Sequence, residues 1–223
     1  MIIPITFTIT TCNRLDLLEK TLTSFSNLNK YPIDEYIMSD DSGSSEVFDF
    51  LKNTFGDKFK ILQNNPKIGL AKSIDRLFSE AKNEYIFHCE DDWFFEGNPN
   101  FINDSLTILE NNKNIHHVWI RHEDDLAQQY LASLNFNEDS IVEFNNIKYK
   151  QIPIIEHWNG FSYNPGLRRK SNYITFFPDG VAAIGDESDC AKYTASFNYK
   201  SVLLNNTSCY HIGYDKRTEN FIH

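Results

Sequence analysis

The chain has 223 residues, of which 41% are hydrophobic and 14% aromatic, and it carries a formal net charge of −10. This length fits one large α/β domain or two small ones, with ample material for a core. The acidic balance argues against a protein that wraps a nucleic-acid backbone, because such proteins need clustered Lys and Arg. It is compatible with a phosphate-bearing small molecule if a cation lies between the carboxylates and the ligand.

The N-terminus and the cysteines indicate the compartment. Met1–Ile5 lacks a basic region and leads directly into a strand-like pattern, so we expect no signal peptide. No apolar run reaches the roughly eighteen residues that a bilayer span requires. The cysteines are scattered and form no CxxC pair, which is typical of reduced thiols in an intracellular protein. We therefore expect a cytoplasmic protein without a membrane span.

The first half of the chain alternates strand and helix patterns. Apolar residues alternate with threonine over Ile5–Ile9, and apolar residues then recur at helical spacing over Leu18–Phe25. The same alternation continues downstream. Further strands are predicted at Tyr36–Met38, Phe59–Leu62, Tyr85–Phe87 and Val118–Arg121, and further helices at Val47–Phe55, Ile68–Ala81 and Asn100–Asn111.

This alternation predicts an α/β fold with a mostly parallel central sheet and helices on both faces. The second half is less regular, with long loops expected over residues 122–165. No repeat, low-complexity tract or linker divides the chain, so we expect a single domain over residues 1–223. In the second half we predict strands at Ile141–Phe144, Tyr149–Ile152, Ser201–Leu204 and Cys209–His211 and a helix at Glu187–Ser196.

Three polar clusters lie just past predicted strand ends. They are Thr10–Arg14, Asp40-Asp41 and Glu90–Asp92. In parallel sheets, ligands bind outside the carboxyl ends of the strands, near a switch in strand order. The three clusters therefore predict one ligand site at this edge of the sheet.

The triplet Glu90-Asp91-Asp92 is the sharpest local feature. Three consecutive carboxylates repel one another unless a cation or solvent compensates them. Hard divalent cations prefer such oxygen ligands, and a cation of this kind neutralises a leaving diphosphate. The alternative is a solvated acidic turn. Because the triplet follows an apolar strand and precedes Trp93-Phe94-Phe95, we favour a metal or nucleotide site.

The pair Asp40-Asp41 forms a second acidic cluster. A carboxylate at this place can accept a hydrogen bond from a base N–H group or from a ribose hydroxyl. Its structural alternative is an Asx-type turn ahead of the helix that includes Glu46, and taken alone the pair favours that alternative.

Four segments together resemble the family 2 glycosyltransferases. They are Ile5–Asn13 (ITFTITTCN), Tyr36–Ser44 (YIMSDDSGS), Gly69–Asp75 (GLAKSID) and Glu84–Trp93 (EYIFHCEDDW), in the order and spacing of that family. The resemblance covers the first 95 residues well and continues more loosely through Asn159–Arg169 and Cys209–Gly213. It implies a GT-A fold, a nucleotide-sugar donor and, usually, an inverting mechanism.

The resemblance also implies roles for individual residues around the nucleotide. Asp41, with Asp40 beside it, would contact the base, commonly uracil, and Asp91 would lie nearer the ribose. A basic tail that includes Arg217 would close over the diphosphate, or else be solvated. The residues assigned to the donor nucleotide are Thr10, Thr11, Arg14, Asp40, Asp41, Lys72, Asp91 and Arg217.

The same resemblance makes Glu90-Asp91-Asp92 a DXD-like motif. It implies that Asp92 binds the metal directly and that His211 completes the metal sphere, since neutral imidazole suits Mn²⁺. Glu90 departs from a strict DXD at its first position, so its place as a third metal residue is open. Taken alone, His211 is an ordinary histidine at the end of a strand. We expect Mn²⁺ or Mg²⁺ at this site.

An inverting transfer also needs a base that deprotonates the acceptor hydroxyl. Asp186, Glu187 and Asp189 supply carboxylates at a predicted helix start, where the helix dipole keeps a carboxylate ionised and where acidic residues also serve as caps. We prefer Glu187, then Asp186. Trp158 and Arg168 sit in a predicted loop and would contact the acceptor, or else pack that loop against the sheet.

The sequence thus predicts a divalent-metal-dependent glycosyltransferase that moves a sugar from a nucleotide diphosphate, most often UDP, to a hydroxyl of a glycan or other acceptor. Residues 1–120 would bind the donor and residues 121–223 the acceptor. The rivals are a non-catalytic nucleotide- or sugar-binding module and a sugar nucleotidyltransferase. The latter normally carries a glycine-rich basic phosphate loop early in the chain, which Thr10–Arg14 is not. The aromatic-rich composition permits a homodimer.

Overall fold

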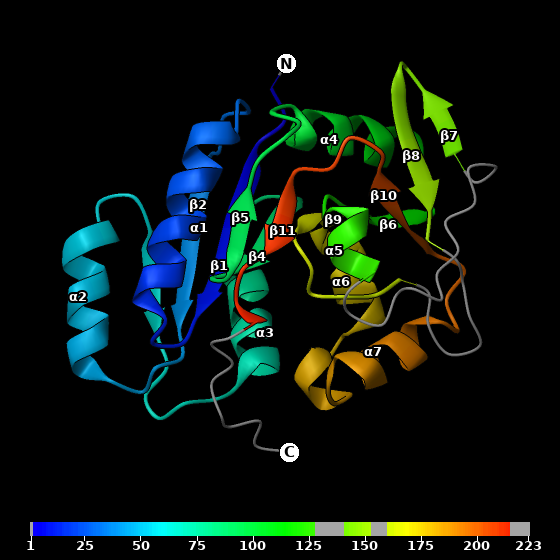
Figure 1. Cartoon of the computed structure of the whole chain (residues 1–223). Coiled ribbons are helices and arrows are strands. Elements are labelled where there is room, and N and C mark those ends of the chain that lie inside the picture. The colour runs from blue at the N-terminus through cyan, green and yellow to red at the C-terminus, as the bar shows by residue number, and fades with distance from the viewer. Residues whose placement is uncertain (1, 128–140, 153–159, 215–223) are drawn as a thin grey trace.

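The computed structural model describes residues 2–127, 141–152 and 160–214. A nine-stranded sheet runs through the molecule (Figure 1). In spatial order its strands are β3 (Lys60–Gln63), β2 (Glu35–Asp40), β1 (Ile5–Thr11), β4 (Tyr85–Glu90), β9 (Gly166–Arg169), β6 (Ile115–Trp119), β10 (Lys200–Leu204), β8 (Ile147–Gln151) and β7 (Ile141–Phe144).

The predicted mostly parallel sheet is confirmed. Strands β3, β2, β1 and β4 pair in parallel, as do β6 and β10. Strand β9 lies between β4 and β6 and is antiparallel to both, and β8 is antiparallel to both β10 and β7. The prediction of a loop around Arg168 was wrong, because this residue lies in β9. The strand predicted at Val118–Arg121 begins earlier, at Ile115, and ends at Trp119.

A separate two-stranded ribbon follows the carboxyl end of β4. Strand β5 (Trp93–Phe95) follows β4 after two residues and pairs antiparallel with β11 (Cys209–His211). In this pairing His211 is the partner of Trp93. The ribbon therefore brings the end of the described chain next to the acidic residues that follow β4.

Helices cover both faces of the sheet, as predicted. One face packs against α1, α2 and α4, and the other against α3, α6, the 3-10 turn η3 and α7. The bounds are α1 (Leu15–Leu28), α2 (Ser45–Phe55), α3 (Leu70–Glu80), α4 (Phe101–Asn111), α5 (Glu123–Ala127), α6 (Lys170–Phe176), η3 (Val181–Ala183) and α7 (Glu187–Thr194).

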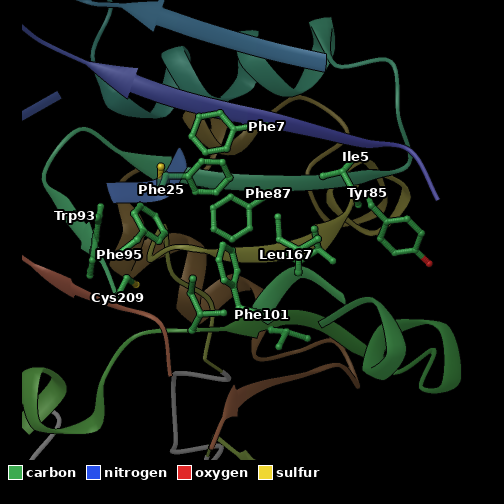
Figure 2. Packing of buried hydrophobic residues seen from close by; sticks show 14 of the residues in the cluster. Ile5, Phe7, Phe25, Tyr85, Phe87, Trp93, Phe95, Phe101, Leu167 and Cys209 are labelled. Atoms are coloured by element: carbon green, nitrogen blue, oxygen red, sulfur yellow. The ribbon is translucent and has the colours of Figure 1, made fainter. Parts of the chain in front are cut away.

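Aromatic side chains fill the first face (Figure 2). Phe7 of β1 and Phe87 of β4 are fully buried and lie with Phe25 of α1 and Phe101 of α4 in one cluster. The ring centroids of Phe7 and Phe25 are 4.4 Å apart, and those of Phe87 and Phe101 are 5.4 Å apart. Successive side chains of a strand point to opposite faces of the sheet. Ile86, which precedes Phe87 in β4, therefore packs on the other face. The core thus fixes β1 and β4 side by side and leaves polar residues for their carboxyl ends.

Within the described residues, no helix combines the length and the apolar character that a bilayer crossing requires. The four cysteines are free thiols in the structure.

Candidate functional site

The predicted polar clusters meet at the carboxyl edge of the parallel strands. In the register of the sheet, Thr11 at the end of β1 is the partner of Asp40 at the end of β2, and Thr10 is the partner of Glu90 at the end of β4. Asp91 and Asp92 follow directly. The expectation that these residues share one edge is confirmed.

Asp91 ties this edge together from inside. Its Oδ2 atom accepts hydrogen bonds from Thr11 Oγ1 at 2.7 Å and from the Cys12 amide at 3.3 Å, and its Oδ1 atom pairs with Arg14. Its backbone carbonyl accepts a hydrogen bond from Thr21 Oγ1. Burial raises the pKa of Asp91 to about 6, although Arg14 opposes this shift. Both side-chain oxygens are engaged within the protein, so the geometry favours a role for Asp91 in shaping the turn after β1 over the predicted ribose contact.

Asp92 lies between a cation and an imidazole. Its Oδ2 atom is 2.6 Å from an Arg14 guanidinium nitrogen and 3.2 Å from His211 Nε2. Its Oδ1 atom is buried and has no hydrogen-bond partner among the described residues. Burial alone would raise the pKa of Asp92, but the hydrogen bonds from His211 and Arg14 hold it below its usual range. Asp92 is thus ionised, and one of its oxygens has no partner within the part of the chain that the structure describes.

The backbone packs closely against this carboxylate. The Ile212 amide donates a hydrogen bond to the Asp92 carbonyl at 2.9 Å. A Cβ atom added to Gly213 would lie 2.4 Å from Asp92 Oδ2, so only glycine fits at that position without a shift of the carboxylate. The segment after β11 therefore forms one wall of the acidic site.

Residues that the sequence analysis missed hold His211 in place. The His211 amide donates a hydrogen bond to Asp125 Oδ2 at 2.9 Å, and Tyr214 donates its hydroxyl hydrogen to Asp125 Oδ1 at 2.6 Å. Arg121 pairs with the same carboxylate at 2.7 Å. These hydrogen bonds outweigh the effect of burial and lower the pKa of Asp125. The signal in the sequence was the acidic run Glu123-Asp124-Asp125 after a strand, inside a region interpreted as loops.

Two protein ligands for a divalent metal are consistent with this geometry. Asp92 Oδ2 and His211 Nε2 are 3.2 Å apart, close to the separation of two ligands that each lie about 2.1 Å from one metal at a right angle. Among the described residues, no group of three or more His, Cys, Asp and Glu side chains could hold a metal ion. Glu90 therefore does not complete a three-residue set with Asp92 and His211. The site fits a metal that takes its remaining ligands from phosphate oxygens or water.

Glu90 is the last residue of β4. Its pKa is raised well above its usual value, first by burial and then by the negative charges of Asp92 and Glu187. The predicted base Glu187 is therefore near the acidic motif. Its Oε1 atom accepts a hydrogen bond from the Tyr163 amide at 2.9 Å. Asp186, in contrast, caps α7, because its Oδ1 atom accepts a hydrogen bond from the Asp189 amide at 2.9 Å.

Asp40, the last residue of β2, and Asp41, which follows it, make different contacts. Asp41 is engaged locally: its Oδ1 atom accepts a hydrogen bond from the Ile68 amide at 2.8 Å and its Oδ2 atom one from the Gly69 amide at 3.0 Å. Asp40 accepts a hydrogen bond from the Ser42 amide through Oδ1, while its buried Oδ2 atom has no partner among the described residues. The pKa of Asp40 is raised, mainly by burial. Asp40 is 0% exposed and Asp41 is 9% exposed, so the contact of either residue with a base or ribose stays a prediction.

The lysine that lies near Asp40 is Lys67, whereas the prediction named Lys72. Lys72 is exposed on α3. Lys67 lies close to Cys12 and Asp40, and its positive charge therefore opposes the rise in pKa that burial causes at both groups. Its side chain also lies beside Gly43, where an added Cβ atom would be 3.2 Å from a Lys67 carbon. Lys67 is thus a missed candidate for the nucleotide pocket, and Lys72 stays a prediction.

The predicted acceptor residues are less favourably placed. Arg168 is 3% exposed and donates a hydrogen bond to the Ser162 carbonyl at 2.9 Å, with His117 beside it. Burial lowers its pKa to about 10. This placement favours packing of β9 over acceptor contact. Trp158 and Arg217 lie outside the described residues.

An open cleft of about 330 Å³ lies beside the histidine. It exposes carboxylates and aromatic rings next to the Asp92–His211 pair. Its lining residues are Glu96, His122, Asp124, Asp125, Tyr210, His211 and Tyr214.

Solved structures share this fold. TarS 1-349 from S. aureus aligns with a TM-score of 0.62 and 13% identity over 95% of this chain and 61% of that chain. The mannosyltransferase PcManGT from Pyrobaculum calidifontis, in complex with GDP-Man and Mn²⁺, aligns with a TM-score of 0.65 and 15% identity over 95% and 57%. TarS 1-349 in complex with UDP-GlcNAc aligns with a TM-score of 0.62 and 13% identity over 98% and 60%. This chain spans about six tenths of those chains, and the fold they share is GT-A.

The family follows from the sequence itself. A family model described as glycosyl transferase family 2 matches residues 6–193, which is most of the chain. No curated protein matches the chain. The chain belongs to glycosyl transferase family 2, which confirms the resemblance seen in its motifs.

Proposed function

We propose that this chain transfers a sugar from a nucleotide diphosphate to a hydroxyl of a glycan or other acceptor, with inversion and with the help of Mn²⁺ or Mg²⁺. The main support for this proposal is the position of the Asp92 carboxylate between Arg14 and His211, just past the carboxyl end of β4. A buried, ionised carboxylate next to an imidazole and a guanidinium suits a diphosphate and its counter-ion.

The nucleoside would lie beyond the ends of β1 and β2. Thr10 and Asp40 lie at these strand ends and Lys67 lies near Asp40, and Asp41 or Asp40 would accept a hydrogen bond from the base or ribose. UDP is our preferred nucleotide. Residues 1–120 would contribute most of this donor half and residues 121–223 the acceptor half, with the cleft beside Tyr210 as one of its surfaces.

Asp92 and His211 would hold the metal. When bound, such an ion supplies positive charge that neutralises the diphosphate as it leaves. The residues around it do the positioning. Asp125 fixes the backbone of His211, and the close approach of Gly213 limits the movement of the Asp92 carboxylate.

Glu187 would act as the base. A carboxylate in this role accepts the proton of the acceptor hydroxyl while that oxygen bonds to the anomeric carbon and the bond from that carbon to the diphosphate oxygen breaks. The Tyr163 amide orients one Glu187 oxygen, Oε1. Asp186 is the second choice, since its carboxylate already caps α7.

Calorimetric and thermal-shift titrations with UDP, GDP, CDP and dTDP, each with and without Mn²⁺, test this function. UDP and GDP lead the panel because the related structures hold UDP-GlcNAc and GDP-Man. A ligand that binds only the folded state raises its apparent stability. We expect a Mn²⁺-dependent shift with one nucleotide, followed by transfer from its sugars. Absence of binding by all four would contradict the proposal and favour a GT-A-like module without nucleotide chemistry.

A further inference from the structure

Arg14 is the cation that compensates the acidic motif. It occupies the N-cap position of α1, and its two terminal nitrogens divide between Asp91 and Asp92. Its side chain is 17% exposed, and the Asp91 and Asp92 side chains are 0% and 6% exposed. The interaction is therefore largely sheltered from solvent, where charge pairs are stronger than at a surface.

We propose that Arg14 is an internal counter-cation whose ion pair with Asp92 opposes metal binding by that carboxylate. A donor diphosphate would draw Arg14 away from Asp92, so that metal and nucleotide bind cooperatively. This inference rests on the proposed function. It concerns the order and coupling of metal and nucleotide binding.

Competition for one oxygen atom carries the inference. Asp92 Oδ2 is the atom that faces His211 Nε2, and the same atom is 2.6 Å from Arg14. A divalent ion placed between Asp92 and His211 would lie next to a guanidinium, and like charges at that distance repel. Without an anion nearby, the metal would have to displace Arg14 from a buried carboxylate or bind beside it, and either costs affinity.

The diphosphate supplies the missing anion. Arg forms bidentate pairs with phosphate as readily as with carboxylate. The Nε atom of Arg14 is buried without a hydrogen-bond partner among the described residues, so a further donor is available. A phosphate at this place would take Arg14 from Asp92 and, at the same time, contribute oxygen ligands to the metal.

Asp91 provides the pivot for this movement. Its Oδ2 atom is fixed by Thr11 and Cys12, so its Oδ1 atom stays in place to hold one Arg14 nitrogen. Arg14 can then release Asp92 without losing its pairing with Asp91. This explains why two adjacent carboxylates are needed when only one faces His211.

Reciprocal titrations test the coupling. Mn²⁺ affinity is measured by calorimetry without nucleotide and with saturating UDP or GDP, for the wild type, Arg14→Met and Lys20→Met. Lys20 is exposed on the same helix, so its variant controls for the loss of one positive charge. For the wild type we expect at least about tenfold tighter Mn²⁺ binding when nucleotide is present, and by linkage the same factor for nucleotide when Mn²⁺ is present. Lys20→Met should match the wild type.

For Arg14→Met we expect Mn²⁺ alone to bind at least about tenfold tighter than to the wild type, with most of the coupling lost. A folded Arg14→Met variant whose affinity for Mn²⁺ alone is unchanged or weaker would overturn the proposal. Thermal melting shows whether the variant is folded. If it is not, Arg14→Lys is used, because a single ammonium cannot bridge both carboxylates as a fork. It should also bind Mn²⁺ alone more tightly than the wild type does, and unchanged affinity would again overturn the proposal.

The wild type separates this inference from the proposed function. Binding of a nucleotide with no mutual effect between it and Mn²⁺ would overturn the coupling and leave the donor site standing. Binding of Mn²⁺ with no nucleotide binding under any condition would overturn the proposed function and the inference with it.

Discussion

Asp92 is the residue on which the proposed metal site depends most. Asp92→Asn keeps the shape of the side chain but removes the charge that pairs with Arg14 and faces His211. We expect nucleotide affinity in the presence of Mn²⁺ to fall at least about tenfold, equivalent to about 1.4 kcal/mol. Calorimetry measures this affinity. Asp57→Asn is the control, because Asp57 is exposed in the turn between α2 and β3, outside the proposed site. Equal affinities for wild type and Asp92→Asn would remove Asp92 from the metal site.

Glu187 is tested through turnover. Glu187→Gln retains an oxygen that can accept the Tyr163 amide hydrogen but cannot take a proton from the acceptor. We expect kcat to fall at least about a hundredfold while the affinity for donor is unchanged. The control is Glu46→Gln, an exposed change in the first turn of α2. A near-normal rate would transfer the role of base to Asp186 or Glu90.

At the residue scale, the acidic motif was predicted because a run of carboxylates after an apolar strand is visible locally, whereas His211 was assigned only through the resemblance to the family. It did not predict Asp125 or Lys67, whose importance comes from contacts with residues distant in the chain. Asp41 shows the same limit. Its carboxylate binds amides at Ile68 and Gly69, and nothing within its own turn indicates that those amides would come so close.

Among the elements, the Asp75 carboxylate on α3 binds η3 and α6. Asp75 accepts hydrogen bonds from the Val181 amide at 2.7 Å and the Ala182 amide at 3.0 Å, and Tyr173 donates its hydroxyl hydrogen to the same group. These contacts anchor η3, the turn that leads into α7 and Glu187. Asp75 is therefore a positioning residue.

We expect Asp75→Ala to lower the free energy of unfolding by about 2 to 4 kcal/mol, since three partly buried donors lose a charged acceptor. The turnover should also fall, with donor affinity near normal, because α7 loses its anchor while the β1–β4 edge does not. Urea unfolding and nucleotide titration measure the two effects. Asp49→Ala on exposed α2 is the control. A drop in donor affinity as large as that in turnover would contradict this division.

Elements were predicted where their pattern is long and regular. Strands β1, β2 and β4 and helices α1 to α4 have apolar residues at the period of the element they form, and all were predicted within a few residues. Strand β5 was missed because it has three residues and follows the acidic turn at once. Strand β9 was missed because Gly166–Arg169 contains two arginines, and Arg168 is buried only through the pairing of β9 with β4 and β6.

For the whole molecule, buried histidines make stability depend on pH. Burial lowers the pKa of His116 to about 3 and that of His117 well below its usual value. Below about pH 6.5 the unfolded chain therefore binds protons that the folded chain excludes, and the contribution of His116 to stability is lost as the pH falls. From pH 6.5 to 5 this loss is about 2 kcal/mol for one such group.

His116→Gln isolates this contribution, because the carboxylates with raised pKa values act equally in both proteins. Relative to the wild type, we expect the variant to gain about 2 kcal/mol of unfolding free energy between pH 6.5 and 5. The starting difference at pH 6.5 includes the lost bond between His116 Nε2 and Ser201 Oγ. Urea unfolding at both pH values measures the change, and parallel curves for the two proteins would show that His116 does not titrate as proposed.

At this scale the sequence predicted the fold class but not the full sheet order. Alternating strands and helices indicate a parallel sheet, whereas the insertion of antiparallel β9 between β4 and β6 joins segments about 50 residues apart or more. No local pattern encodes that pairing. Through this pairing, β9 attaches the segment that carries α7 to strands β4 and β6 of the first 120 residues.

The location of the metal tests the account most directly. A crystal of the protein with Mn²⁺ and the nucleoside diphosphate that binds most tightly is measured at the manganese absorption edge. We expect one anomalous peak between the Asp92 carboxylate and His211 Nε2, in contact with the diphosphate, with Arg14 turned from Asp92 to a phosphate. A nucleotide bound away from the ends of β1 and β4, or a manganese peak away from Asp92, would contradict the account.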